Sequence, residues 1–330
     1  MRVTSLATFL LVPCLYSSAQ AEIFEIDIPA NNVAYSTQTG MLYATVASSA
    51  GVPFGNTLIE IDPATAAIVD GVFVGSEPQA LAISPEAAVA YVGLEGAAAV
   101  RSVDLSTLTA GVQFSLGPST GFGPLFPTRI AVMPGSPSTI AVSRHDKGVS
   151  PDYQGVGIFD SGVMRSTAIT SFYGPVSLAF GSSASTLYGY DSDGTQDLYD
   201  MAIDSNGVTV ASSASNYMGN ADILVDNNLI YATSGAVLDT ANFQLVGTYQ
   251  SQGPVVVDDS VGFVMFVDQN TIQAFDRDTF LPLFSVSIEN ASGNPISAAS
   301  CGSKCVAAVF DSHQIFVVTD VERIFADGFE

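Results

Sequence analysis

The sequence predicts an all-β protein, a seven-bladed β-propeller of four-stranded antiparallel blades whose ring is closed by the N-terminal strand. The first observation is a repeat of apolar runs that end in Asp, at Asp62, Asp104, Asp160, Asp204, Asp239, Asp276 and Asp320. Six intervals separate the first of these residues from the last, which gives a period of about 43 residues. A second marker, an apolar residue followed by Tyr, keeps this period at Tyr43, Tyr91, Tyr188 and Tyr231. Beyond residue 21, no stretch keeps a helical apolar pattern for more than two turns.

Each unit contains four short β-type runs. In the second unit these runs are expected at residues 79–84, 89–93, 97–104 and 109–116, and turn-forming residues separate them. The first run of a unit is apolar on both sides, as in the segments 80–83 and 255–257, which suits a strand with neighbouring sheets on both faces.

The two chain ends are expected to share the last blade. Residues 23–28 form a strand that belongs to no unit of its own, and the seventh unit lacks a fourth strand after Asp320. We therefore expect the N-terminal strand to complete the seventh blade.

Residues 1–21 have the order of a secretory signal peptide: an early Arg2, an apolar stretch and the ending Ala19-Gln20-Ala21. A lipoprotein anchor at Cys14 is the alternative, but Pro13 stands where that cleavage needs a small residue. We expect residues 22–330 to form a single propeller domain with a short tail from about residue 321. The protein is then secreted, in a periplasmic or extracellular compartment, and no later apolar run is long enough for a transmembrane helix.

The two remaining cysteines, Cys301 and Cys305, are expected to form a disulfide across a tight turn, because an exported protein meets an oxidising compartment. The alternative is a redox or metal pair, which the four-residue spacing does not favour.

The charge balance restricts the partners. Nine Lys and Arg residues stand against 32 Asp and Glu residues, a net charge of -23, which argues against nucleic acid or anionic lipid. Only 12% of residues are charged and 48% are hydrophobic, so the chain is not a disordered acidic segment. The basic residues gather locally, at Arg101, Arg129, Arg144, Lys147 and Arg165, whereas residues 166–276 contain no Lys or Arg.

The second unit resembles the YVTN-type propeller repeat. The resemblance lies in Leu81-Ala-Ile-Ser-Pro-Glu86, Ala90-Tyr-Val-Gly93 and the turn Val103-Asp104 before Ser106-Thr107. It implies a seven-bladed propeller of secreted or cell-surface proteins, often without a known activity. Residues 324–330 are similar to a short terminal tag of exported proteobacterial proteins.

The seven repeat Asp residues are interpreted as turn residues. An Asp side chain at a hairpin turn accepts the backbone N–H two residues further on, which fixes the turn. This removes them from the list of candidate ligand-binding residues.

The longest connections point to a binding face. They are residues 48–56, 145–155 and 191–197, each between a second and a third strand, and residues 117–127 between two blades. Alternate turns of an up-and-down sheet lie at opposite edges, so these loops are expected on one face of the ring, where a protein or carbohydrate ligand would bind. The candidate binding residues are Phe122, Phe126, Arg129, Arg144, His145 and Tyr153.

One loop on this face alternates carboxylates, at Asp191, Asp193 and Asp197, as a Ca²⁺ loop does. It departs from the EF-hand pattern, so an Asx turn without an ion is the alternative. No other cofactor is expected.

We expect a monomeric binding module rather than an enzyme. The alternative is a lactonase-like or other metal-assisted hydrolytic propeller, with His145, His313, Glu95 and Asp191 as candidate site residues. No Ser/His/Asp signature supports it, and the G-x-S-x-G string at residues 117–121 is not followed by the helical pattern that this motif requires.

Overall fold

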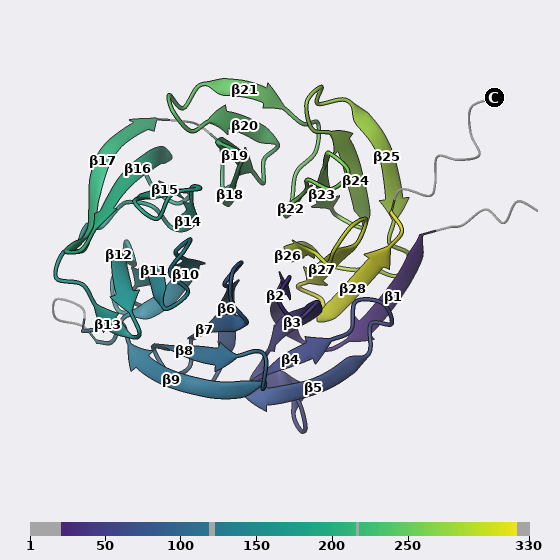
Figure 1. Cartoon of the computed structure of the whole chain (residues 1–330), viewed down its shortest axis with the longest axis horizontal. Coiled ribbons are helices and arrows are strands. Elements are labelled where there is room, and N and C mark those ends of the chain that lie inside the picture. The colour runs from purple at the N-terminus through teal and green to yellow at the C-terminus, as the bar shows by residue number, and fades with distance from the viewer. Residues whose placement is uncertain (1–20, 119–122, 216–217, 322–330) are drawn as a thin grey trace, which may run out of the picture.

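The computed structural model describes residues 21–118, 123–215 and 218–321. Within these residues, seven four-stranded antiparallel sheets are arranged as a ring around a central channel (Figure 1). The predicted fold class, with seven blades of four strands, is confirmed. No helix in the described ranges is both long and apolar enough to cross a membrane.

Each blade runs outwards from the channel, its first strand innermost. Blade 1 consists of β2 (Ala30–Ser36), β3 (Met41–Val46), β4 (Thr57–Ile61) and β5 (Ile68–Phe73). Blade 2 consists of β6 (Pro78–Ile83), β7 (Val89–Leu94), β8 (Ala99–Asp104) and β9 (Thr109–Ser115). Blade 3 consists of β10 (Phe126–Val132), β11 (Thr139–His145), β12 (Tyr153–Asp160) and β13 (Val163–Met164). One short 3-10 helix, η1 (Ser48–Ala50), lies between β3 and β4.

Blades 4, 5 and 6 follow the same plan on the other side of the ring. Blade 4 consists of β14 (Ser177–Phe180), β15 (Thr186–Tyr190), β16 (Asp197–Asp204) and β17 (Gly207–Ser215). Blade 5 consists of β18 (Ile223–Asp226), β19 (Leu229–Ala232), β20 (Ala236–Asp239) and β21 (Leu245–Thr248). Blade 6 consists of β22 (Val255–Asp258), β23 (Phe263–Asp268), β24 (Thr271–Asp276) and β25 (Pro282–Ser287).

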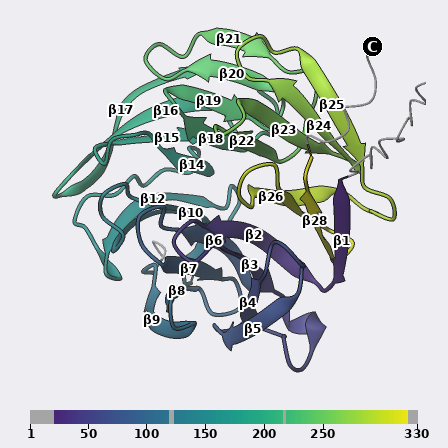
Figure 2. The same ribbon diagram turned by 45° about the vertical axis from the view of Figure 1, so that its right-hand side comes forward.

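Blade 7 is built from both ends of the described chain. Its strands are β26 (Pro295–Ser300), β27 (Val306–Phe310), β28 (Gln314–Thr319) and, as the outer strand, β1 (Glu22–Asp27). In the antiparallel register Glu22 lies opposite Thr319 and Asp27 lies opposite Gln314. The predicted closure of the ring by the N-terminal strand is therefore confirmed, and Figure 2 shows β1 beside β28.

The core lies between neighbouring blades, because each sheet presents one apolar face to the blade before it and the other to the blade after it. For example, Tyr43 and Leu58 of blade 1 pack with Val92 and Leu94 of blade 2. The second strand of a blade is the most deeply buried, and every residue of β27 is buried. The innermost strands are less buried, since they line the channel: Leu81, Ala82 and Ile83 of β6 are all partly exposed.

Candidate functional site

The long connections of the ring lie on one face. They are residues 47–56, 146–152 and 191–196, which follow second strands, and the connections between blades at 116–125 and 165–176. Residues 119–122 lie outside the described part of the chain. Successive turns of an antiparallel sheet alternate between its two edges, so second-to-third connections share a face with the connections between blades. Contacts across blades agree with this placement: Ser48 donates a hydrogen bond to Glu77, and Lys147 contacts Glu95. We call this side of the ring the long-loop face.

The channel contains a cavity of about 640 Å³ that all seven innermost strands help to line. Its wall is mixed. Polar side chains come from every blade except blade 6, and apolar side chains come from blades 2, 4, 5, 6 and 7. The polar residues include Asn31, Gln79, Thr128, Arg129, Asp222 and Thr233, and the apolar ones include Val255 and Ile296. The cavity can therefore offer both hydrogen bonds and apolar contact.

An ion pair lies at this channel wall. The guanidinium of Arg129, on β10 of blade 3, donates to the carboxylate of Asp222, which precedes β18 of blade 5, at 2.5 Å. The backbone of Asp222 is held in turn by Thr233, since the Asp222 N–H donates to the Thr233 hydroxyl and the Thr233 N–H donates to the Asp222 carbonyl, both at 3.0 Å. The pair therefore reaches past blade 4, which contributes Ser177 to the same wall. Both side chains stay half-exposed, at 44% and 42%, so an external ligand can reach them.

A second group of side chains comes from blades 2 and 3, and we call it the Phe126 cluster: Phe126, His145, Lys147 and Glu95. The rings of Phe126 and His145 are stacked with centroids 5.5 Å apart, and the Lys147 ammonium lies 4.0 Å from the centre of the Phe126 ring. Lys147 pairs with the Glu95 carboxylate at 2.8 Å, and His145 Nε2 lies 3.7 Å from the same carboxylate.

Thr128 joins the cluster to the cavity. Its hydroxyl is 2.8 Å from His145 Nδ1, and the residue itself lines the channel next to Arg129. The structure therefore brings together Phe126, Arg129 and His145 of the predicted binding residues.

Two other predicted binding residues are core residues, which corrects the expectation that they form part of a surface. Arg144 is 4% exposed and Tyr153 is 5% exposed. Arg144 lies on β11, and its guanidinium donates long hydrogen bonds to the carbonyls of Leu116, Gln154 and Ile169, each at 3.5 Å. Burial lowers the pKa of Arg144 and raises the pKa of Tyr153. Phe122, the remaining candidate, lies outside the described residues.

The acidic loop of blade 4 is folded around its first carboxylate. Asp191 is buried and accepts hydrogen bonds from the N–H groups of Asp193, Gly194 and Thr195 at 3.2, 2.8 and 2.9 Å, and from the Thr195 hydroxyl at 3.1 Å. Asp197 accepts the Ser215 hydroxyl at 2.7 Å, and the side chain of Asp193 is exposed. The loop therefore has the hydrogen bonds of an Asx turn. Among the described residues no group of three or more His, Cys, Asp or Glu side chains is placed to hold a metal ion.

The repeat Asp residues form the turns that the sequence predicts in five blades. In each of these the carboxylate accepts the N–H two residues further on: Asp62, Asp104, Asp204, Asp239 and Asp276. For Asp204 this bond from Asn206 lowers the pKa of the carboxyl.

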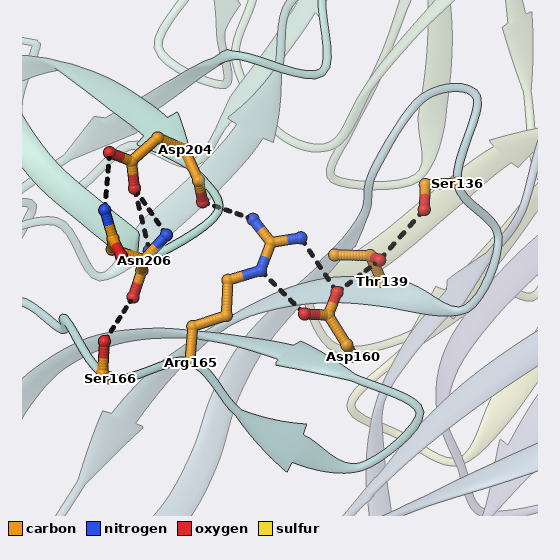
Figure 3. Close-up of polar contacts among 8 residues, drawn as sticks. Ser136, Thr139, Asp160, Arg165, Ser166, Asp204 and Asn206 are labelled. Atoms are coloured by element: carbon orange, nitrogen blue, oxygen red, sulfur yellow. Dashed lines mark hydrogen bonds and ion pairs between the residues drawn. The ribbon is translucent and has the colours of Figure 1, made fainter.

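Asp160 is different because a two-residue turn with positive φ at Ser161 and Gly162 follows it. Its carboxylate accepts two hydrogen bonds from Arg165, at 2.8 and 2.9 Å, and Arg165 also donates to the Asp204 carbonyl of blade 4 at 2.7 Å (Figure 3). This Asp therefore links two blades instead of fixing its own turn.

Cys301 and Cys305 form the predicted disulfide, with Cα atoms 5.0 Å apart. It closes the turn between β26 and β27, on the face opposite the long loops. The Lys304 N–H inside this turn donates to the Asp258 carboxylate of blade 6 at 3.0 Å, so the turn also contacts the neighbouring blade.

Asp222, Thr128 and Thr233 are absent from the residues that the sequence suggested. A signal existed for the first two. In the strand register, Thr128 of blade 3 corresponds to Gln79 of blade 2, and Asp222 of blade 5 corresponds to Ala80. All four residues line the channel, so alignment of the repeats places Thr128 and Asp222 there. No such rule identifies Thr233, which reaches the cavity from a second-to-third connection.

Comparisons with known proteins show the fold and no family. No family model matches the chain, and no curated protein matches it. Among solved structures it is similar to a chain of the Kuenenia stuttgartiensis hydrazine synthase, with a TM-score of 0.66 and 15% identity over 94% of this chain and 99% of the other. It is also similar to the β-propeller domain of Cps50 (Swd1) from Myceliophteria thermophila, with a TM-score of 0.70 and 12% identity over 91% of this chain and 99% of the other. At these identities the likeness concerns the propeller fold alone.

Proposed function

We propose that this propeller is an exported interaction module that binds a protein or carbohydrate ligand at the mouth of its channel, on the long-loop face. One observation carries the proposal: a cavity of about 640 Å³ with a half-exposed charged pair in its wall, Arg129 and Asp222, and with Thr128 in its wall connected to the Phe126 cluster. A propeller is a rigid scaffold, and loops held on such a scaffold are a common place for binding residues.

The chemistry of the wall suits a ligand rich in hydroxyl or amide groups. Asn31, Gln79 and Thr128 offer both donors and acceptors, while Arg129 offers only donors and Asp222 only acceptors. Because the two charged groups are already paired, a neutral polar ligand can bond to them without leaving either charge buried and uncompensated. Phe126 adds an aromatic ring, the residue class that dominates many protein contacts together with Arg.

Export is part of the proposal. The leader-like residues 1–21 support it, as does the disulfide, because disulfides persist mainly in oxidising compartments. The resemblance of the second unit to the YVTN-type repeat points the same way. We also propose that the protein is a monomer, and that its net charge of -23 excludes nucleic acid as a ligand.

The test is a binding screen with matched variants. Labelled protein that lacks residues 1–21 is applied to an array of glycans and to an array of exported proteins. A ligand retained by the native protein should also be retained by the Asp70→Ala variant, whose substitution lies on the exposed outer strand β5. The Arg129→Ala and Asp222→Ala variants should bind it at least tenfold more weakly. Equal binding by all four proteins would place the ligand elsewhere and overturn the proposal.

A Ca²⁺ ion at Asp191, Asp193 and Asp197 stays a prediction of the sequence. An ion there would compete with the loop's own N–H groups for the Asp191 carboxylate. The lactonase-like alternative also stays untested, and no contact among the described residues favours it over binding.

A further inference from the structure

The outer strand of blade 4 has no protection along most of its edge. β17 (Gly207–Ser215) is nine residues long, and it contains no charged residue and no proline. Six of its nine residues are exposed. Figures 1 and 2 place it on the outer rim of the ring. A long uncharged edge strand presents free N–H and C=O groups that another extended chain can pair with.

Most other outer strands of the ring have a feature that discourages an added strand from pairing with them. β1 carries three acidic residues, β5 carries Asp70, β25 begins with Pro282, and β13 and β21 have only two and four residues. Charges, proline and short length all discourage pairing at an edge. β9, with seven uncharged residues, is the nearest comparison and therefore provides a control strand.

The beginning of β17 already accepts an added segment. Thr167, in the connection that leaves blade 3, forms a parallel bridge to Gly207: its N–H donates to the Asn206 carbonyl at 2.7 Å, and the Val208 N–H donates to the Thr167 carbonyl at 3.1 Å. Ser166 donates its hydroxyl to the same Asn206 carbonyl, as Figure 3 shows. After Val208, no segment of the described chain pairs with the outer edge of β17. The edge can therefore pair, and residues 209–215 remain available.

The charged side chains around this edge are mainly acidic. Residues 166–276 contain twelve Asp and no Lys, Arg or His. Three of these Asp residues lie on β16, the strand paired with β17, where Asp197 faces Ser215, Asp200 faces Ser212 and Asp204 faces Gly207. β9 differs in this respect, because Arg101 of the adjacent strand donates to its Gln113. A partner that lies along residues 209–215 therefore meets mainly acidic side chains, because the cation near the start of the strand, Arg165, already donates to the Asp160 carboxylate and the Asp204 carbonyl.

We propose that residues 209–215 are a docking edge for an extended, cationic segment of a partner protein, which adds to blade 4 as a fifth strand. Backbone hydrogen bonds would supply the affinity, as in other cases of strand addition, and the Asp residues would select the charge of the partner. A second copy of this chain is disfavoured, because its own blade 4 carries the same negative charge. This edge lies on the outer rim and is separate from the channel mouth, so the inference does not depend on the ligand proposed there.

The experiment uses a fluorescent eight-residue peptide of alternating Val and Lys as the probe, and the same peptide with Glu in place of Lys as the control. Binding to the full protein is followed by fluorescence anisotropy at low and high salt. Hydrogen exchange then locates the protected amides. The variant Ser213→Lys puts a positive charge on the edge of β17, and the matched variant Val112→Lys does the same on the exposed edge of β9.

We expect the Lys peptide to bind, the Glu peptide to bind at least tenfold more weakly, and high salt to weaken binding. Protection should appear within residues 209–215. Ser213→Lys should weaken binding at least tenfold, whereas Val112→Lys should change it less than twofold. Protection elsewhere, equal loss in both variants, or no binding of the Lys peptide would overturn the proposal. A concentration-dependent dimer that protects 209–215 without peptide would also overturn it, by identifying a second copy as the occupant.

Discussion

Arg129 and Asp222 are 93 residues apart in the sequence, yet their side chains form an ion pair at 2.5 Å across the wall of the channel. The pair connects blade 3 with blade 5 past the intervening blade. Because both side chains are half-exposed, we expect the pair to add little to the stability of the ring.

The first prediction concerns the stability contribution of this pair. Arg129→Gln and Asp222→Asn should each change the free energy of unfolding by less than about 1 kcal/mol. The reason is that water weakens the electrostatic attraction between exposed charges. Urea denaturation of both variants and the native protein measures this. A loss of several kcal/mol would mean that the pair is structural.

The second prediction concerns ring closure. A chain that begins at Ile28 lacks β1 and should lose about 3–5 kcal/mol of stability relative to one that begins at Ala21. The deletion removes the hydrogen bonds to β28 and exposes Ile315 and Val317, which pack against Phe24 and Ile26. Denaturant unfolding of the two chains gives the comparison. Equal midpoints would show that the chain ends do not support each other.

The third prediction concerns the disulfide. Replacing Cys301 and Cys305 by Ser should cost about 2 kcal/mol, the chain-entropy estimate for so short a loop. A reducing agent should lower the stability of the native protein by a similar amount and leave the double variant unchanged. Calorimetry with and without reductant tests this, and a native protein that is insensitive to reductant would contradict it.

The fourth prediction concerns pH. Hydrogen bonds from Arg165 and then Thr139 lower the pKa of Asp160 in the folded protein. A carboxyl with a lowered pKa stabilises the fold above its unfolded-state pKa of about 3.9, and this contribution is lost as the pH falls through the lower folded value. The native protein should therefore be more stable than Asp160→Asn at pH 6, and the difference should shrink below about pH 4. A difference that stays constant from pH 6 to pH 2 would rule out this linkage.

The fifth prediction concerns the acidic loop. Asp191→Ala should cost about 1–3 kcal/mol, even with a chelator present, because it removes the buried carboxylate that accepts hydrogen bonds from three N–H groups of the loop. Asp193→Ala, at an exposed position of the same loop, should change stability by less than about 0.5 kcal/mol. Thermal melts with EDTA and with Ca²⁺ distinguish an Asx turn without an ion from a loop that binds Ca²⁺. A rise in Tm with Ca²⁺ that both variants abolish would indicate an ion in the loop.

The repeat made the fold predictable because one short unit contains its own turn chemistry. Asp104 and Asp204 stand where a hairpin needs an acceptor, and both accept the expected N–H. Ring closure followed from counting strands, since the strand predicted at residues 23–28 belonged to no unit of its own, and the observed strand β1 pairs with β28. Asp160 shares the marker but has a different role, because Arg165 provides a stronger partner than a turn N–H.

The site was less predictable because loop membership does not determine side-chain direction. Arg144 and His145 are neighbours in the sequence, but successive residues of a strand point to opposite sides, and a register shift separates Ser143 from His145. Arg144 therefore enters the core while His145 reaches the Phe126 cluster. Asp222 could be found only by aligning the start of each innermost strand, because its partner Arg129 belongs to another blade.

The most direct test of the channel-mouth site is a charge swap. The double variant Arg129→Asp/Asp222→Arg keeps the attraction between the two positions, so its stability should equal that of the native protein, but its guanidinium approaches the cavity from blade 5 instead of blade 3. We predict that a ligand identified by the screen binds this variant at least tenfold more weakly, at unchanged stability. Native affinity in the swapped protein would contradict a binding role for the pair.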